Sequence, residues 1–207
     1  MRLAYRQFHE QSAVATATLV TLAEFGLLAF DPEKRGQELV IHGLIQQGLY
    51  RGDRGDCLRG AWLHMARLGL AVSARQDTAR ALAIRDRLRM FEAQAEYHLV
   101  RDLGVEASPR LNLREDLADG ARLMLIQAQI WNARLAVHPV LLRTDEGRLF
   151  MMNPFSGRDD EVTQQHISMH IASPVQAGPQ QFAGGMYLDT GLALRVTPGD
   201  AALRMQC

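Results

Sequence analysis

The chain has 207 residues, enough for one domain with a substantial core, and its 23 basic and 23 acidic side chains leave no net charge. This balance excludes a general electrostatic affinity for nucleic acid or for anionic membranes. With only two cysteines, Cys57 and Cys207, the chain cannot build a disulfide framework, so we expect a reducing, cytoplasmic location.

Helices and one strand are predicted in the first half of the chain. Ser12 can cap the first helix, Gly48 ends the second, and Gly69 closes the third. The fourth helix carries apolar side chains at three- and four-residue spacing. The predicted helices cover residues 12–29, 33–47, 57–68 and 78–103, and the strand covers residues 70–75.

Strands dominate the prediction for the second half. A tight turn at Asp145–Gly147 joins two of them into a hairpin. The predicted elements are a helix at 112–118, strands at 122–127, 136–143 and 148–152, a helix around 161–171, a loop at 173–185, and strands near 186–189 and 192–196. Helices followed by strands predict an α+β fold, with N-terminal helices packed on an antiparallel sheet. We expect a single domain over 1–207, its helical part at about 10–103 and its sheet part at about 121–200.

The predicted hairpin carries a histidine and an asparagine. His138 lies near the start of its first strand, and Asn153 ends the second, directly before Pro154. A histidine that acts as a base needs a polar neighbour to fix its tautomer, and a carboxamide on the next strand provides one. Each residue alone is also explained as a core histidine and as an Asn-Pro turn.

These residues, in this order, resemble the bacteriocin-processing (double-glycine leader) cysteine peptidases, a bacterial branch of the papain-like superfamily. The resemblance spans about residues 3–170 and rests on four segments. They are 5–7 with Gln7, 55–72 with a glycine-led helix, 136–142 with His138, and 152–157 with Asn153. It implies a papain-like fold in which His138 is the base, Asn153 orients it, and Gln7 helps to hold the oxyanion.

The resemblance breaks at the nucleophile. Ser12 stands nearest the position where the family has a cysteine that opens a long helix. A serine needs a well-oriented base to react, and a serine at a helix start is also a common cap. Cys57 is the alternative nucleophile, since a cysteine at a helix start favours the thiolate; Gln46 or Gln47 would then contact the oxyanion. Pro139 after the histidine predicts an edge strand or a bend.

Two functions from different classes follow. The first is a peptidase, amidase or acyltransferase that acts on a peptide or an acyl-carrier-linked substrate through Ser12 or Cys57, without a cofactor or metal. The second is an inactive domain of the same fold that binds a peptide or a partner protein. A weaker alternative is an unrelated α+β protein. Neither nucleic acid nor a membrane is expected as a partner, and the sequence does not give the oligomeric state.

Overall fold

The computed structural model describes residues 2–8, 12–48, 57–77, 106–108, 111–131, 134–163, 165 and 186–199. Helices occupy its N-terminal part and strands most of the rest, so the chain is an α+β protein, as predicted. The helices are α1 (Ala13–Glu24), α2 (Gly36–Gly48), α3 (Cys57–Arg67) and α6 (Leu113–Asp116), with a 3-10 turn at Ala118–Gly120. The strands are β1 (Leu70–Asp77), β2 (Glu106–Ser108), β3 (Arg122–Trp131), β4 (Arg134–Asp145), β5 (Arg148–Asn153), β6 (Arg158–Glu161) and β7 (Met186–Pro198).

Helix α1 is the central helix of the described structure. Every residue from Ala13 to Ala23 is buried, which is typical of a helix enclosed on all sides rather than one with a solvated face. Two buried hydroxyls form hydrogen bonds within the helix: Thr18 donates to the backbone carbonyl of Val14, and Thr21 donates to that of Ala17. The helix ends at Glu24, before Gly26 with a φ of 72°, and therefore does not extend to residue 29 as predicted.

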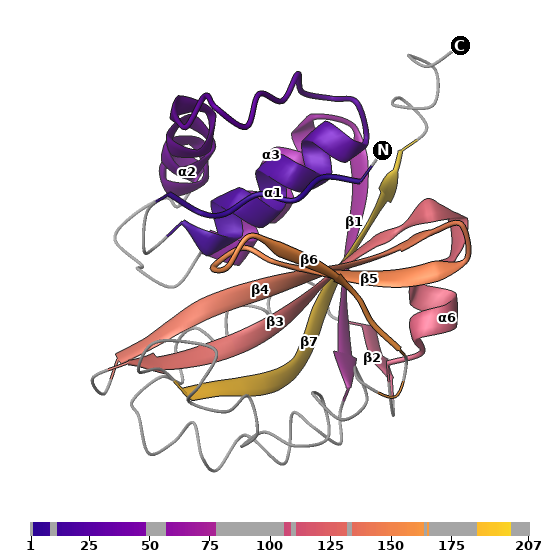
Figure 1. Cartoon of the computed structure of the whole chain (residues 1–207). Helices are drawn as coiled ribbons and strands as arrows, with labels where there is room; N and C mark the ends of the chain where they lie inside the picture. Colours follow the sequence, from indigo (N-terminus) through magenta and orange to yellow (C-terminus); the bar gives the residue numbers. More distant parts are fainter. Residues whose placement is uncertain are drawn as a thin grey trace.

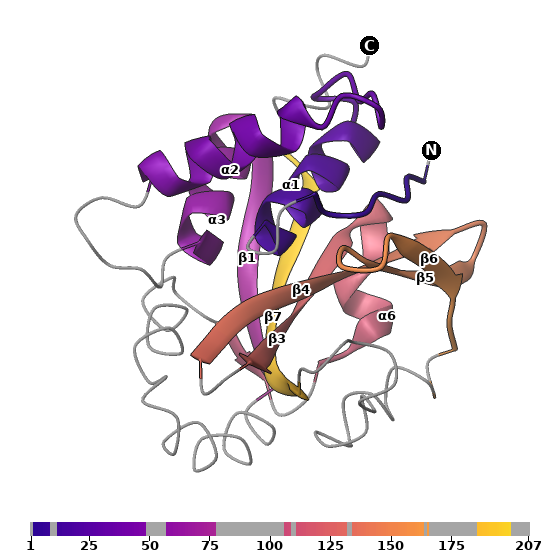
Figure 2. The ribbon, with the colours of Figure 1, turned by 60° about the vertical axis from the view of Figure 1, so that its left-hand side comes forward.

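Helices α2 and α3 approach each other closely at Gly60. A Cβ atom at this position would lie 2.5 Å from the backbone oxygen of Ile45, so α3 can pack at this depth only with glycine. Figure 2 shows α1, α2 and α3 gathered on one side of the sheet.

Replacing Gly60 with alanine should therefore destabilise the protein by about 1–3 kcal/mol, because the backbone of one helix must move to admit the methyl group. The matched control is Gly43→Ala in α2, where nothing lies within 4 Å of the added Cβ. That substitution should stabilise the protein by about 0.5–1 kcal/mol through helix propensity. Urea unfolding measures both changes, and equal stability of the two variants would contradict the close approach at Gly60.

The seven strands form one sheet in the order β2-β1-β7-β3-β4-β5-β6. All neighbours are antiparallel except β1 and β2, which pair in parallel, so the prediction of an antiparallel sheet holds for six strands. The last strand in sequence, β7, lies between β1 and β3 near the middle of the sheet (Figure 1). It is one strand rather than the two predicted, and its register against β3 shifts between Ile126 and Gln127.

Two apolar clusters cover the two faces of the sheet. Leu141 and Met124 pack against α1, α2 and α3 in the larger cluster. Val140 and Leu142, the alternate residues of β4, pack against α6 in the smaller one, together with Leu125. This alternation is the physical basis of the layered arrangement, since successive side chains of a strand point to opposite faces.

The N-terminal segment 2–8 is fastened across the sheet by charged side chains. Arg143 of β4 forms ion pairs with Glu24 of α1 at 3.0 Å and with Asp159 of β6 at 3.0 Å, and it donates to the backbone oxygen of Leu3 at 2.7 Å. Glu24 in turn accepts a hydrogen bond from the backbone N–H of Leu3. Arg2 pairs with Asp159 and lies over the ring of Phe150. Helix α1, the sheet and the start of the chain thus share one buried ionic network.

Other predicted elements have different outcomes. The hairpin of β4 and β5 is confirmed, with its turn at Glu146 and Gly147 in positive φ. Residues 158–161 form β6, so the helix predicted around 161–171 does not include residue 161; of its remaining span only residues 162, 163 and 165 are described, and residue 165 is helical. The helix at 78–103 and the loop at 173–185 lie outside the described residues. No helix in the described part of the chain has both the length and the apolar character needed to cross a membrane.

Candidate functional site

His138 lies at an open edge of the sheet. Strand β4 pairs with β5 only from Leu141 onwards, so at His138 and Pro139 it has β3 on one side and no described strand on the other. Proline cannot donate to a strand partner, which agrees with its place where β4 has a described partner on one side only. By alternation His138 has the parity of Val140 and Leu142, which pack on the α6 side.

Asn153 fixes the proton on His138. The Oδ1 atom of Asn153 accepts the backbone N–H of Phe155 at 2.9 Å, which identifies it as the amide oxygen. The same oxygen lies 3.2 Å from Nε2 of His138, so the imidazole donates Nε2–H and carries its lone pair on Nδ1. The predicted pair is therefore in contact, and the carboxamide selects one tautomer of the ring.

Burial keeps this ring neutral. The His138 side chain is 1 % exposed, and loss of hydration lowers its pKa from 6.5 to about 4, against the opposing effect of the hydrogen bond with Asn153. At physiological pH the imidazole is therefore neutral, with a lone pair on Nδ1, and it is a weaker base than an exposed histidine.

Gln7 and Phe8 connect the hairpin to the helices. The backbone N–H of Gln7 donates to the oxygen of Pro154 at 2.7 Å, next to Asn153. The N–H of the following residue, Phe8, donates to both carboxylate oxygens of Glu38 in α2 at 2.9 Å. Because consecutive residues are only about 3.8 Å apart, the Asn-Pro end of the hairpin and Glu38 both contact one short stretch of backbone.

Ser12 faces Glu38. Its hydroxyl donates to Oε1 of Glu38, and both side chains are fully buried. Ser12 directly precedes α1 and its carbonyl accepts the N–H of Thr16, but its hydroxyl makes no capping hydrogen bond. The interpretation of Ser12 as a side-chain cap is therefore wrong, because the hydroxyl contacts a carboxylate of another helix instead.

Tyr5 belongs to the same cluster. Burial raises the pKa of Tyr5, and the negative charge of Glu38 and a hydrogen bond to it raise this pKa further. The Tyr5 ring packs edge-on against Phe30 at 5.2 Å, which fixes the position of the hydroxyl. Glu38 thus receives hydrogen bonds from the Ser12 hydroxyl, the Phe8 amide and the Tyr5 hydroxyl.

Sequence reasoning missed Glu38. The signal was its place on α2, since Glu38 shares a helical stripe with Ile41 and Ile45, both buried. A carboxylate within an apolar stripe must find polar partners when it is buried, so it marks a contact with another element. Cys57 does begin α3, as predicted, but its side chain lies outside what the structure describes.

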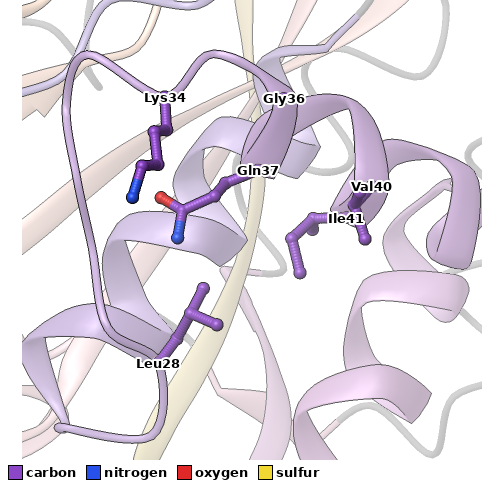
Figure 3. A pocket seen from close by; sticks show the side chains of 6 residues that line it. All are labelled: Leu28, Lys34, Gly36, Gln37, Val40 and Ile41. Carbon is purple, nitrogen blue, oxygen red and sulfur yellow. The ribbon is translucent and has the colours of Figure 1, made fainter.

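An apolar hollow of about 490 Å³ lies beside the start of α2 (Figure 3). None of the predicted site residues lines it. The side-chain amide of Gln37 forms two hydrogen bonds with the adjoining loop. It donates to the backbone oxygen of Ala29 at 2.6 Å and accepts from the backbone N–H of Asp31. The hollow can receive an aliphatic or aromatic group. It is lined by Leu28, Lys34, Gly36, Gln37, Val40 and Ile41.

No protein-family model matches the chain. A search of curated proteins also found no match. Among solved structures, the crystal structure of the Pseudomonas avirulence protein AvrPphB is similar to this chain, with a TM-score of 0.47 and 9% sequence identity over 95% of this chain and 97% of that one. At that level the likeness assigns neither a family nor an activity to this chain.

Proposed function

We propose that this protein is a papain-like acyl-transfer enzyme, a peptidase, amidase or acyltransferase acting on a peptide or a carrier-linked acyl group. The observation that supports it best is the imidazole of His138, which is neutral and held as the Nε2–H tautomer by Asn153. A base with these properties can take a proton from a nucleophile or from the acceptor that resolves an acyl intermediate.

The arrangement of elements agrees with the papain-like resemblance. A candidate nucleophile precedes α1, the histidine lies in β4, and the asparagine before proline ends β5. Gln7, the proposed oxyanion donor, is anchored beside the Asn-Pro end through Pro154. Ser12 is the nucleophile we propose, and Cys57 at the start of α3 is the alternative.

A fluorophosphonate probe should label wild-type protein on Ser12, because phosphonylation requires a hydroxyl whose proton has an acceptor in contact with it. Site-resolved mass spectrometry after proteolysis measures the label. Ser12→Ala should abolish it, and Cys57→Ser should leave it unchanged.

A label at Cys57 with iodoacetamide at mildly acidic pH would instead identify a low-pKa thiolate as the nucleophile. If neither probe labels the wild-type protein, the enzymatic proposal is contradicted.

The second candidate is an inactive domain of this kind that binds a peptide or a partner protein. Two observations favour it: the hydroxyl of Ser12 is fully buried against Glu38, and His138 has the strand parity of the α6 face. The absence of both labels, together with saturable binding of a peptide, would support this candidate.

A further inference from the structure

Glu38 is the carboxylate in contact with the hydroxyl of Ser12. The contact joins α2 to the start of α1 through two residues that are 26 positions apart in the sequence, and both side chains are excluded from solvent. The two hydrogen bonds from Phe8 and the hydrogen bond with Tyr5 hold the carboxylate in place. The carboxylate is therefore preorganised beside the oxygen atom that would form an acyl bond.

We propose that Glu38 is a further catalytic residue, which accepts the proton of Ser12 when the acyl-enzyme forms. This inference rests on the proposed function and assigns the first proton transfer to a residue other than His138. His138 has the strand parity of Val140 and Leu142, which pack on the α6 face, whereas Glu38 already receives the Ser12 hydroxyl.

A carboxylate suits a serine nucleophile and not a cysteine. A nearby negative charge disfavours a thiolate, so Glu38 would make a cysteine at position 12 less reactive. A serine hydroxyl is not ionised before it reacts and instead needs a proton acceptor in contact with it. Glu38 therefore provides a chemical reason for a serine at this position.

Each step of the proposed reaction balances. The Ser12 oxygen forms a bond to the acyl carbon while its proton passes to the Glu38 carboxylate, and the carbonyl electron pair moves to the oxygen. When the intermediate collapses, the leaving group departs with the proton returned by Glu38. In the second half, a water or an amine attacks the acyl carbon while its proton passes to the Glu38 carboxylate, which returns that proton to the Ser12 oxygen as the acyl bond breaks.

The test compares rates of fluorophosphonate labelling at Ser12 in full-length variants. Glu38→Gln should lower the labelling rate by about 100-fold or more, the usual contribution of a general base. The matched control is Glu33→Gln, which makes the same change at an exposed position and should label at the wild-type rate.

Thermal unfolding checks that the variants are folded, and Glu38→Asp provides a second, milder variant with intermediate labelling. Two results would overturn the role of Glu38 alone. In the first, Glu38→Gln is labelled as fast as the wild type. In the second, His138→Gln takes no label although the wild type does. A wild-type protein that takes no label at Ser12 would overturn the proposed function and this inference together.

A thiol at position 12 gives an independent measurement. In Ser12→Cys, the carboxylate should suppress alkylation by iodoacetamide near neutral pH, and adding Glu38→Gln should accelerate it by about tenfold. Mass spectrometry resolves position 12 from Cys57 and Cys207. If Ser12→Cys is instead alkylated fast, and adding His138→Gln slows that alkylation, the imidazole lies against the nucleophile. This result would overturn the assignment to Glu38.

Discussion

Replacing Arg143 with methionine should lower the free energy of unfolding by about 3–5 kcal/mol, the usual cost of removing one partner of a buried ion pair. Arg143 is 1 % exposed and its partner Glu24 is fully buried, so water cannot replace the lost guanidinium. The substitution also removes the hydrogen bond to the oxygen of Leu3, which helps to hold the N-terminal segment. Burial lowers the pKa of Arg143, while the charges of Glu24 and Asp159 oppose that shift.

The matched control for this prediction is Arg148→Met in the neighbouring strand β5. Arg148 also forms two ion pairs, with Glu146 and Glu161, but all three side chains are about half exposed or more. Solvent-exposed pairs of this kind contribute about 0–1 kcal/mol, so this variant should be close to wild type. Urea unfolding of both proteins decides the matter, and similar losses would show that the buried network is not what holds α1 to the sheet.

The second large effect is a dependence of stability on pH that originates at His138. Its pKa is lowered from 6.5 to about 4 in the folded protein, so the unfolded chain binds more protons than the folded one between these values. The neutral ring therefore contributes stability that is fully present above pH 6.5 and is lost as the pH falls through about 4. A shift of this size corresponds to about 3 kcal/mol.

The measurement is the difference in unfolding free energy between wild type and His138→Gln across this pH range. The difference should shrink by about 3 kcal/mol on acidification, because the glutamine variant has no group that titrates at this position. Titration of the imidazole by NMR gives the folded pKa directly. A midpoint near 6.5 would contradict the burial of the ring and remove the main support for a neutral base at physiological pH.

Local signals in the sequence predicted much of the fold. Gly48 and Gly69 marked the ends of α2 and α3, and the turn at Asp145–Gly147 gave the hairpin of β4 and β5. The contact between His138 and Asn153 was predictable for the same reason, since one tight turn determines which residues of two adjacent strands meet. The burial and the neutral state of the His138 ring could not be predicted, because burial depends on the whole fold.

Contacts between distant segments could not be predicted in this way. Glu38 meets Ser12 although α1 and a loop separate them in the sequence, and Arg143 meets Leu3 across most of the chain. In each case a charged residue stood directly beside an apolar stretch, which indicates that it needs a partner if it is buried without identifying that partner. The short strands β2 and β6 were also missed, since three or four residues leave little periodicity to detect.

The position of β7 has a consequence for biosynthesis. This strand is made after all the other described elements, yet it bridges β1 and β3. A nascent chain on the ribosome therefore lacks the bridge between those strands until residues 186–198 have emerged from the exit tunnel. During that interval the edges of β1 and β3 that face β7 are unpaired and are targets for chaperones.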